Sequence, residues 1–221
     1  DAHEGDRRRR SLREFGYLQD GGTSHFNIVD EHGNAIAMTT SINTNFGSHI
    51  MGSSGIVFSN TMDDFACPGA PDHYGLRPAP SNFIQPTKRP LSSMSPTLVF
   101  NKKNSLVLAI GASGGPKIIT AVLQVVVNHL VVGRSLYHSL LQARLHNQLI
   151  YHGAAVTAVE SNHERNMTVA TREYLQGIGH VLLNVDFSGT VQAISLLHNN
   201  NNNTVQTAVC DPRKGGIPSG Y

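Results

Sequence analysis

The sequence predicts an α+β layered sandwich, because three features of the chain point the same way. A hairpin opens the predicted body, an almost wholly apolar helix follows, and strands return near the end. Strands grouped before and after helices, and joined by hairpins, favour this arrangement over a doubly wound parallel sheet. The 221 residues suffice for one domain of roughly 150 to 200 residues with a short arm.

Residues 1–22 are predicted to form an arm before the folded body, which we expect to span residues 23–221. The arm is rich in arginine, but its acidic residues cancel that charge, and the whole chain has a formal net charge of +2. No net basic field would attract phosphates, so we expect no nucleic-acid partner. The chain starts at Asp1 without a charged and apolar leader, so we expect any membrane anchor to lie upstream.

The first hairpin is predicted from two strand-like segments, residues 26–30 and 34–43, around a three-residue loop that ends in glycine. Such loops need a residue at positive φ, which glycine adopts freely. If the residues that flank the loop pair with each other, Thr23 lies opposite Ser41, and Asn43 continues the same face. A slip of one residue would turn this face over, so the prediction depends on the loop assignment.

The middle of the chain is predicted to contain a short strand at 55–58, a long loop at 67–80 and a second hairpin with strands at 97–100 and 106–110. The strand segments are apolar, and turn-forming residues bound them. The loop is rich in Pro and Gly and is long enough for a lid or binding role to be considered, although most such loops only connect elements.

Helices and further strands follow the second hairpin. Pro116 suits the first turn of a helix and Gly133 its end, so the apolar run between them is predicted to be a helix buried against a sheet. Polar residues interrupt this run, and it is too short to cross a bilayer, which needs about 20 apolar residues. The predicted elements from here on are helices at 118–132, 135–143 and 164–175 and strands at 181–185, 190–197 and 205–210.

The residues that bind metals in proteins show no binding pattern in this chain. The two cysteines, Cys67 and Cys210, form no metal or redox motif and no disulfide framework, and they leave the redox compartment open. Twelve histidines are present, but none lies in an HExxH motif or a Cys/His cluster. We therefore expect no metal and no cofactor.

The junction between Gly22 and Thr23 is a candidate origin of a nucleophile. Cleavage of this peptide bond would expose the threonine hydroxyl beside a new α-amine, whose ordinary pKa of about 7.7 to 8.0 suits a general base. A Gly-Gly-Thr sequence is more often a plain turn. The junction alone therefore does not establish an N-terminal nucleophile.

Seven motifs, in chain order, give the junction its context. They are Thr23-Ser-His25, Ser41-Ile-Asn43, Asn60-Thr-Met-Asp-Asp-Phe65, Arg89-Pro-Leu-Ser-Ser-Met94, Gly111-Ala-Ser-Gly-Gly115, Arg144-Leu-His-Asn-Gln148 and Asp211-Pro-Arg-Lys-Gly-Gly216. Together they resemble the small subunit of γ-glutamyltransferases, the glutathione hydrolases, over about residues 17–221. The resemblance implies an N-terminal-nucleophile hydrolase with an αββα sandwich, made as one precursor that cuts itself into a large and a small subunit.

The resemblance implies a cut between Gly22 and Thr23, with Thr23 as the catalytic nucleophile. A donor such as glutathione would form a γ-glutamyl ester on Thr23, which water resolves in hydrolysis and an amino acid or dipeptide resolves in transpeptidation. Ser41 takes the place of a threonine whose hydroxyl supports the nucleophile and the self-cleavage. Gly114 and Gly115 match a backbone pair that stabilises the oxyanion. Taken alone, the two glycines could equally be a turn between strand and helix.

The resemblance also implies a site for the α-amino and α-carboxylate groups of the donor. Asn43 matches a contact to one of these groups, and Asp64 matches the residue that binds the α-ammonium. Ser92 and Ser93 match a pair of hydroxyls that bind the α-carboxylate. Tyr74 falls where some members, but not all, have a tyrosine on the lid over the pocket.

Two departures from the family pattern bear on activity. Thr61 stands where the family has Glu or Gln as a further ligand for the α-ammonium, so donor affinity is expected to suffer. The second departure is that this sequence does not contain the large subunit, which is the expected partner and supplies an arginine for the α-carboxylate and much of the pocket wall.

The resemblance implies a location outside the cytoplasm, at the cell surface, secreted or in the periplasm. For the motifs that start at Arg144 and Asp211 we expect packing or subunit contacts.

Two other interpretations stay open. A non-catalytic protein made of the light chain alone would keep the fold and act as a binding or assembly partner. An acylase of the same fold would act on another amide. Asp64, with Ser92 and Ser93, argues against the acylase, since an acylase has no need to bind both ends of an amino acid.

Overall fold

The computed structural model describes residues 22–162, 164–186, 188–198 and 204–220, so the predicted arm up to residue 21 lies outside the described residues. Short helical turns are labelled η. The elements in chain order are β1 (Thr23–Val29), β2 (Ala35–Ser41), η1 (Thr61–Asp64), η2 (Pro80–Asn82), β3 (Thr97–Phe100), β4 (Leu106–Ser113), α2 (Lys117–Val126), η3 (Val127–Val131), α3 (Leu136–Leu141), β5 (Leu145–His146), β6 (Thr157–Glu160), α4 (Val169–Gly177), β7 (Leu182–Val185), β8 (Thr190–His198) and β9 (Thr204–Cys210).

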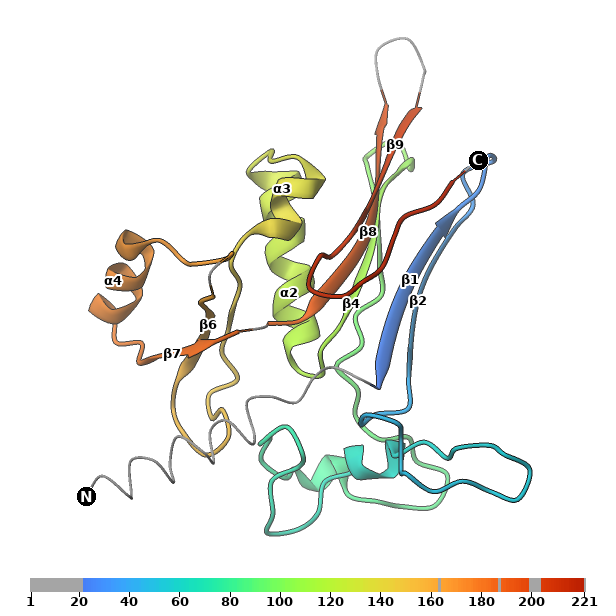
Figure 1. Ribbon diagram of the computed structural model, residues 1–221, viewed down its shortest axis with the longest axis vertical. Coiled ribbons are helices and arrows are strands. Elements are labelled where there is room, and N and C mark those ends of the chain that lie inside the picture. The colour runs from blue at the N-terminus through green and yellow to red at the C-terminus, as the bar shows by residue number, and fades with distance from the viewer. Residues whose placement is uncertain (1–21, 163, 187, 199–203, 221) are drawn as a thin grey trace.

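The strands of the described residues form three sheets, with strand orders β1-β2, β3-β4-β8-β9 and β5-β6-β7. All pairings are antiparallel except that of β6 with β7. Figure 1 shows the β1-β2 sheet on one side of the four-stranded sheet, with α2 and α3 on the other side. The structure therefore confirms the α+β class. The β1-β2 sheet, the four-stranded sheet and the helices α2 and α3 form three successive layers.

The main core lies between the four-stranded sheet and the helices. Ile118 and Val125 of α2 and Leu140 of α3 pack against buried side chains of β4, β8 and β9. The opposite face of α2 is open, and Ile119 and Leu123 are more than half exposed. The apolar helix thus buries one face, as predicted, and leaves an apolar face uncovered.

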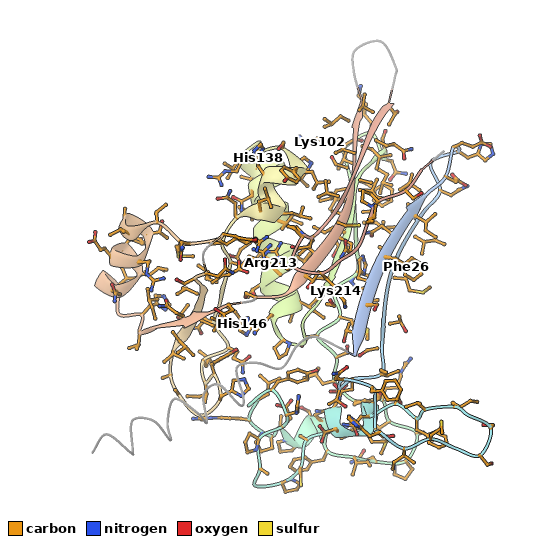
Figure 2. The ribbon with its side chains drawn as sticks, in the orientation of Figure 1. Phe26, Lys102, His138, His146, Arg213 and Lys214 are labelled. Atoms are coloured by element: carbon orange, nitrogen blue, oxygen red, sulfur yellow. The ribbon has the colours of Figure 1, made fainter. Side chains whose placement is uncertain are left out.

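The first hairpin has the predicted register. Thr23 pairs with Ser41, and the side chains of β1 and β2 alternate between an inner face, which packs on β4 and β8, and an outer face. Thr23 and His25 are buried on the inner face. Figure 2 shows Phe26 on the side of β1 away from the larger sheet. The large apolar side chains of the outer face are Phe26, Ile28, Ile36 and Met38, all between 41% and 52% exposed.

The strand predicted at residues 55–58 is wrong. Only an isolated bridge joins Met51 to Val57, and no ladder follows from it. Gly55 has a φ of 82° and its N–H donates to the carbonyl of Gly52, so the chain turns here instead of extending. The apolar residues that suggested a strand, residues 56–58, follow this turn and make backbone hydrogen bonds to residues 48–52.

Two predicted helices have different limits. The apolar helix is α-helical only to Val126 and continues as the π-helical turn η3. The helix predicted from Glu164 begins at Val169, because the Thr168 side chain accepts a hydrogen bond from the N–H of Thr171 and caps the helix there. No helix in the described part of the chain is long and apolar enough to cross a membrane.

Strands β5 and β6 were not predicted from the sequence. All four residues of β6 are buried, and the strand ends in Glu160, a residue type that is seldom fully buried without a partner. Strand β4 also extends beyond its predicted end at Ile110 and runs to Ser113. This extension carries the backbone directly to Gly114 and Gly115.

A buried cluster of charges joins the C-terminal segment to β6. Arg213 donates to Glu160 at 2.5 Å and to Asp211 at 3.0 Å, and Arg144 donates to Asp211 at 2.8 Å. Burial alone would raise the pKa of Asp211, but the charges of Arg144 and Arg213 hold it below its usual value. Figure 2 shows Arg213 in the interior of the molecule. The packing role expected of the motifs that start at Arg144 and Asp211 is confirmed.

Candidate active site

Thr23, the candidate nucleophile, begins β1 and is 6% exposed. Its hydroxyl oxygen lies 2.8 Å from the hydroxyl oxygen of Ser41. The Ser41 hydroxyl donates to the carbonyl oxygen of Gly22 at 3.2 Å and accepts from the N–H of Asn43 at 2.9 Å. Because a hydroxyl has a single proton and Ser41 directs its own to Gly22, the Thr23 hydroxyl is the donor between the two side chains.

The carbonyl group of Gly22 receives two hydrogen bonds. The N–H of Ile42 donates to its oxygen at 2.8 Å, and the Ser41 hydroxyl is the second donor. Both donors polarise the peptide bond that joins Gly22 to Thr23. A Cβ atom on Gly22 would lie 2.1 Å from the carbonyl oxygen of Asn43, so this position accepts only glycine.

A contact from the C-terminal segment reaches the candidate nucleophile. Nζ of Lys214 donates to the carbonyl oxygen of Thr23 at 2.8 Å, and Figure 2 shows Lys214 beside β1. The buried ion pairs of the neighbouring Arg213 fix this part of the chain. Sequence reasoning missed Lys214, since no local pattern links a lysine to a residue 191 positions away.

A cavity of about 330 Å³ opens beside Thr23, within the size range of small-molecule sites. The structure brings almost all of the sequence-predicted site residues to its wall. Gly22 and Gly114 are the exceptions, because Gly22 packs against the backbone of Asn43 and Gly114 against Gly189. The predicted residues that line the cavity are Thr23, Ser41, Asn43, Thr61, Asp64, Tyr74, Ser92, Ser93 and Gly115.

Asn43 connects the end of β2 to the segment that carries Asp64. Its φ is 69°, a left-handed conformation that Asn tolerates better than most residues, and its Nδ2 donates to the carbonyl of Asn60 at 3.0 Å. The N–H of Asn60 donates in turn to the carbonyl of Ile42 at 2.9 Å. These two bonds hold η1, with Thr61 and Asp64, next to the candidate nucleophile.

Asp64 is a half-buried acid in the cavity wall. Burial raises the pKa of Asp64 to about 6, and the charges of Asp63 and Asp72 add to the rise. A cation placed in the cavity would lower this pKa and would in turn be held by the carboxylate. Asp64 is therefore suited to bind an ammonium group.

Ser92 and Ser93 line the cavity on a segment that Asn82 ties to Asp64. Nδ2 of Asn82 donates to the carbonyl of Asp64 at 2.8 Å, and its Oδ1 accepts from the N–H of Leu91 at 2.9 Å. One asparagine thus fixes the spacing between the acid and the two hydroxyls. The cavity combines an acceptor for a cation with hydroxyl donors for an anion.

Two arginines, Arg77 and Arg89, also line the cavity. A guanidinium group matches the geometry of a carboxylate. Sequence reasoning assigned the arginine for the α-carboxylate to a partner subunit and gave these two no role. Arg89 begins the motif that contains Ser92 and Ser93, and this position in the motif is the signal that could have indicated it.

Gly115 and Tyr74 pack too closely for a side chain to fit between them. A Cβ atom on Gly115 would lie 2.5 Å from Cε1 of the Tyr74 ring, and Gly115 has a φ of 57°. The Tyr74 hydroxyl donates to Oδ1 of Asn43 at 3.1 Å. The tyrosine therefore bridges the end of β2 and the glycine turn that follows β4.

Thr61 occupies the cavity wall at the start of η1. Its hydroxyl donates to the hydroxyl of Ser59 at 3.3 Å. The short side chain presents neither a carboxylate nor an amide oxygen to a cation in the cavity. Asp64, on the same turn, is the acid of η1 that lines it.

The His, Cys, Asp and Glu side chains are scattered over the part of the chain that the structure describes. There, no three or more side chains of His, Cys, Asp or Glu are grouped so that they could hold a metal ion. Cys67 and Cys210 are both free thiols, the first exposed and the second partly buried. Burial raises the pKa of the Cys210 thiol, and Asp211 adds to the rise.

Comparison with known proteins agrees with this geometry. The family model of gamma-glutamyltranspeptidase matches residues 4–221, and the chain belongs to that family. It is 40% identical over 218 residues to Glutathione hydrolase 2 of Arabidopsis thaliana, with 94% of this chain and 37% of that protein covered. It is 33% identical over 201 residues to Scoloptoxin SSD20 of Scolopendra dehaani, with 90% of this chain and 96% of that protein covered. The chain is thus homologous to glutathione hydrolases.

A solved structure supports the fold assignment. A mutant of gamma-glutamyltranspeptidase from Helicobacter pylori superposes with a TM-score of 0.78 at 34% sequence identity, over 86% of this chain and 100% of that one. The α+β fold is therefore that of gamma-glutamyltranspeptidases, in the N-terminal-nucleophile hydrolase family. The chain spans 37% of the length of the plant relative, a portion of the size of a small subunit.

Proposed function

We propose that this chain is the small catalytic subunit of a γ-glutamyltransferase that cuts its own precursor between Gly22 and Thr23. Residues 1–22 are then the end of the large-subunit segment, and residues 23–221 are the catalytic subunit. The observation that carries the proposal is the hydrogen-bonded path from Thr23 through Ser41 to the carbonyl of Gly22.

In the proposed self-cleavage, the hydroxyl oxygen of Thr23 attacks the carbonyl carbon of Gly22. Ser41 accepts the Thr23 proton as it gives its own to the carbonyl oxygen, which the N–H of Ile42 also stabilises. The C–N bond then breaks, the α-amine of Thr23 takes up a proton, and an ester joins Gly22 to the Thr23 oxygen. Water hydrolyses this ester, which leaves a carboxylate on Gly22 and a free amine and hydroxyl on Thr23.

In the proposed transfer reaction, the free α-amine of Thr23 is the general base for its own hydroxyl. The hydroxyl oxygen attacks the γ-carbonyl of glutathione or another γ-glutamyl compound, the C–N bond breaks, and the leaving amine takes up the proton. Water then resolves the γ-glutamyl ester in hydrolysis, and an amino acid or dipeptide resolves it in transpeptidation. Backbone N–H groups of Gly114 and Gly115 are the proposed donors to the oxyanion.

The cavity supports recognition of both charged ends of an α-amino acid. Asp64 is the proposed contact of the α-ammonium, and Ser92 and Ser93 those of the α-carboxylate. Asn43 borders the same space and is held by Tyr74. A plain acyl chain would leave the Asp64 carboxylate without a cation, which favours a γ-glutamyl donor over the substrate of a simple acylase.

The large subunit of the same precursor is the proposed partner. The outer face of β1-β2 supports this partnership, because its four apolar side chains are 41% to 52% exposed and form one surface. The family resemblance supports a location of the heterodimer outside the cytoplasm. We propose that it works without a cofactor.

A non-catalytic protein made of the light chain alone, which acts as a binding or assembly partner, is the second candidate. The relative Scoloptoxin SSD20 favours it, because this chain matches 96% of the length of that protein. In that case the cavity would bind a γ-glutamyl compound without turnover. Cleavage of the precursor and turnover of a γ-glutamyl substrate are expected of the catalytic subunit and not of the non-catalytic light chain.

The test is release of the aniline from a γ-glutamyl anilide by the protein expressed from its complete reading frame. We expect turnover by the wild type, none by Thr23→Ala, and reduced turnover by Thr23→Ser, which keeps a hydroxyl. Ser41→Ala is expected to slow self-cleavage about a hundredfold, since it removes a preorganised donor. Thr40→Ala, on the outer face, is the matched control. A wild type that neither cleaves nor turns over would favour the second candidate.

A further inference from the structure

The loop of residues 72–76, which carries Tyr74 to the cavity, is shaped by its own hydrogen bonds. Oδ1 of Asp72 accepts from the N–H of Tyr74 at 2.9 Å and from the N–H of Leu76 at 2.8 Å. The N–H of Asp72 donates to the carbonyl of Leu76 at 3.1 Å, which closes the base of the loop. We call this segment the covering loop. Its internal bonds set its shape but not its position over the cavity.

Two contacts from outside set that position. Nε2 of Gln148 donates to the carbonyl oxygen of Tyr74 at 3.0 Å. At the next residue, a Cβ atom on Gly75 would lie 2.8 Å from the backbone nitrogen of His152, so the two backbones touch. The covering loop is therefore held from the segment that follows β5, about 75 positions away in the chain.

Gln148 is itself fixed from both ends of its amide. Its Nε2 also donates to the carbonyl of Ile150 at 3.1 Å, so its Oε1 faces Nε2 of His146, at 2.8 Å. An amide oxygen only accepts, so Nε2 of His146 carries the proton and Nδ1 faces the hydroxyl of Thr120 at 2.9 Å. Burial lowers the pKa of His146, which favours this neutral ring. The covering loop is thus connected to helix α2 through a chain of partly buried polar groups.

The other end of this chain is the cavity. The Tyr74 ring lies on Gly115, and the Tyr74 hydroxyl donates to Asn43. If the carbonyl of Tyr74 lost its donor, the ring and hydroxyl would lose their fixed position over both residues. Gln148 acts at a distance, because it contacts the backbone of Tyr74 and the cavity wall is built by the ring.

We propose that Gln148 is a positioning residue of the γ-glutamyl donor site, which it organises by anchoring the covering loop through the carbonyl of Tyr74. This inference rests on the proposed function for its substrate, and on the contacts above for its mechanism. Gln148 touches neither the nucleophile nor the proposed contacts of the donor. Its removal therefore acts on donor affinity and leaves the chemical step at Thr23 in place.

The experiment compares Gln148→Met with Gln142→Met, a control glutamine whose side chain donates to the carbonyl of His138 on helix α3. We expect the donor KM of Gln148→Met to rise about fivefold to tenfold, the effect of losing the one of its hydrogen bonds that reaches Tyr74. The kcat and the rate of self-cleavage are expected to change less than about twofold, and the control to match the wild type. Gln148→Glu keeps an acceptor for His146 and removes the donor to Tyr74, so a similar KM is expected.

A double variant tests the route of the effect. In a Tyr74→Ala background, Gln148→Met is expected to add no further rise in donor KM, because its effect passes through Tyr74. Amide hydrogen exchange of residues 72–76 is expected to quicken about tenfold in Gln148→Met and to stay unchanged in Gln142→Met.

An active wild type with an unchanged KM in Gln148→Met, or with additive effects in the double variant, would overturn the proposal. An inactive wild type would overturn the proposed function instead. Hydrogen exchange would then still decide the anchoring: faster exchange would uphold it, and unchanged exchange would overturn it.

Discussion

Gly22 packs directly against the backbone of Asn43, so that a Cβ atom on Gly22 would lie 2.1 Å from the Asn43 carbonyl oxygen and 2.5 Å from the carbonyl carbon. No flexible side chain is involved that could move aside. The glycine before the candidate nucleophile is therefore required by close approach of two backbones. The same approach brings the Gly22 carbonyl to the N–H of Ile42.

Gly22→Ala is expected to block self-cleavage. The added methyl group must displace the carbonyl of Gly22 from its two donors, and a misplacement of about 1 Å can cost a hundredfold in rate. The measurement is the fraction of precursor cut over time on a denaturing gel. Gly177→Ala is the matched control, because a Cβ atom there meets nothing within 4 Å. Equal cleavage of both variants would contradict the account.

The raised pKa of Asp64 predicts how kcat/KM depends on pH in the acid range. The pKa of Asp64 is raised to about 6 by burial first and then by Asp63 and Asp72, and only the ionised carboxylate binds an ammonium. The kcat/KM for a γ-glutamyl donor is therefore expected to rise with pH through about 6. Because the folded-state pKa exceeds the ordinary value of 3.8, this carboxyl also lowers the stability of the fold as the pH rises from 3.8 to about 6.

Asp63→Asn isolates this effect. It removes a charge that raises the pKa of Asp64, and Asp63 itself is exposed and does not line the cavity. The acid limb of kcat/KM is expected to move to lower pH. Glu31→Gln, at an exposed position of the hairpin loop, is expected to leave the limb in place. If the acid limb of kcat/KM stays at the same pH in Asp63→Asn, Asp64 is not the group whose titration sets this limb.

The buried ion cluster predicts a stability effect. Arg213→Met leaves Glu160 and Asp211 buried with fewer partners, and breaking a buried pair costs about 3 to 5 kcal/mol of unfolding free energy. Arg172→Met, which removes a solvent-exposed hydrogen bond from the partly buried Arg172 to Asn184, is expected to cost less than about 0.5 kcal/mol. Denaturant unfolding of the two variants measures the difference. Similar losses would show that the cluster is not a special source of stability.

Thr61→Gln is expected to increase donor affinity. The longer side chain can bring an amide oxygen toward the ammonium that Asp64 is proposed to bind, and one such bond corresponds to a fall in donor KM of about fivefold. Thr61→Val, which keeps the shape and removes the hydroxyl, is expected to leave KM unchanged. The measurement is KM for a γ-glutamyl anilide. An unchanged KM in Thr61→Gln would mean that this position does not face the ammonium.

Local patterns were enough to predict the first hairpin and with it part of the candidate site. A short loop ending in Gly33 set the register, and the register placed Thr23 opposite Ser41. The side-chain period of two then put both hydroxyls on one face. Asn43 was predicted to continue that face, but β2 ends at Ser41 and Asn43 has a φ of 69°. The other cavity residues came from the family resemblance, because no local pattern connects η1 to the segment around Ser92.

The unpredicted features depend on contacts between distant parts of the chain. Strand β6 is short and ends in Glu160, whose burial makes sense only when Arg213 is placed beside it. The bond from Lys214 to the carbonyl of Thr23 joins the two ends of the described chain. Gln148 likewise has no signal in the spacing of the sequence, because its partner is the backbone of a loop about 75 positions away.

The most direct test of the central claim is the intact mass and N-terminal sequence of the protein expressed from its complete reading frame, alongside Thr23→Ala. The account predicts a small chain that begins at Thr23 together with a larger chain in the wild type, and one uncut chain in Thr23→Ala. A wild type that stays uncut, or is cut at another bond, would contradict Thr23 as the nucleophile of self-cleavage.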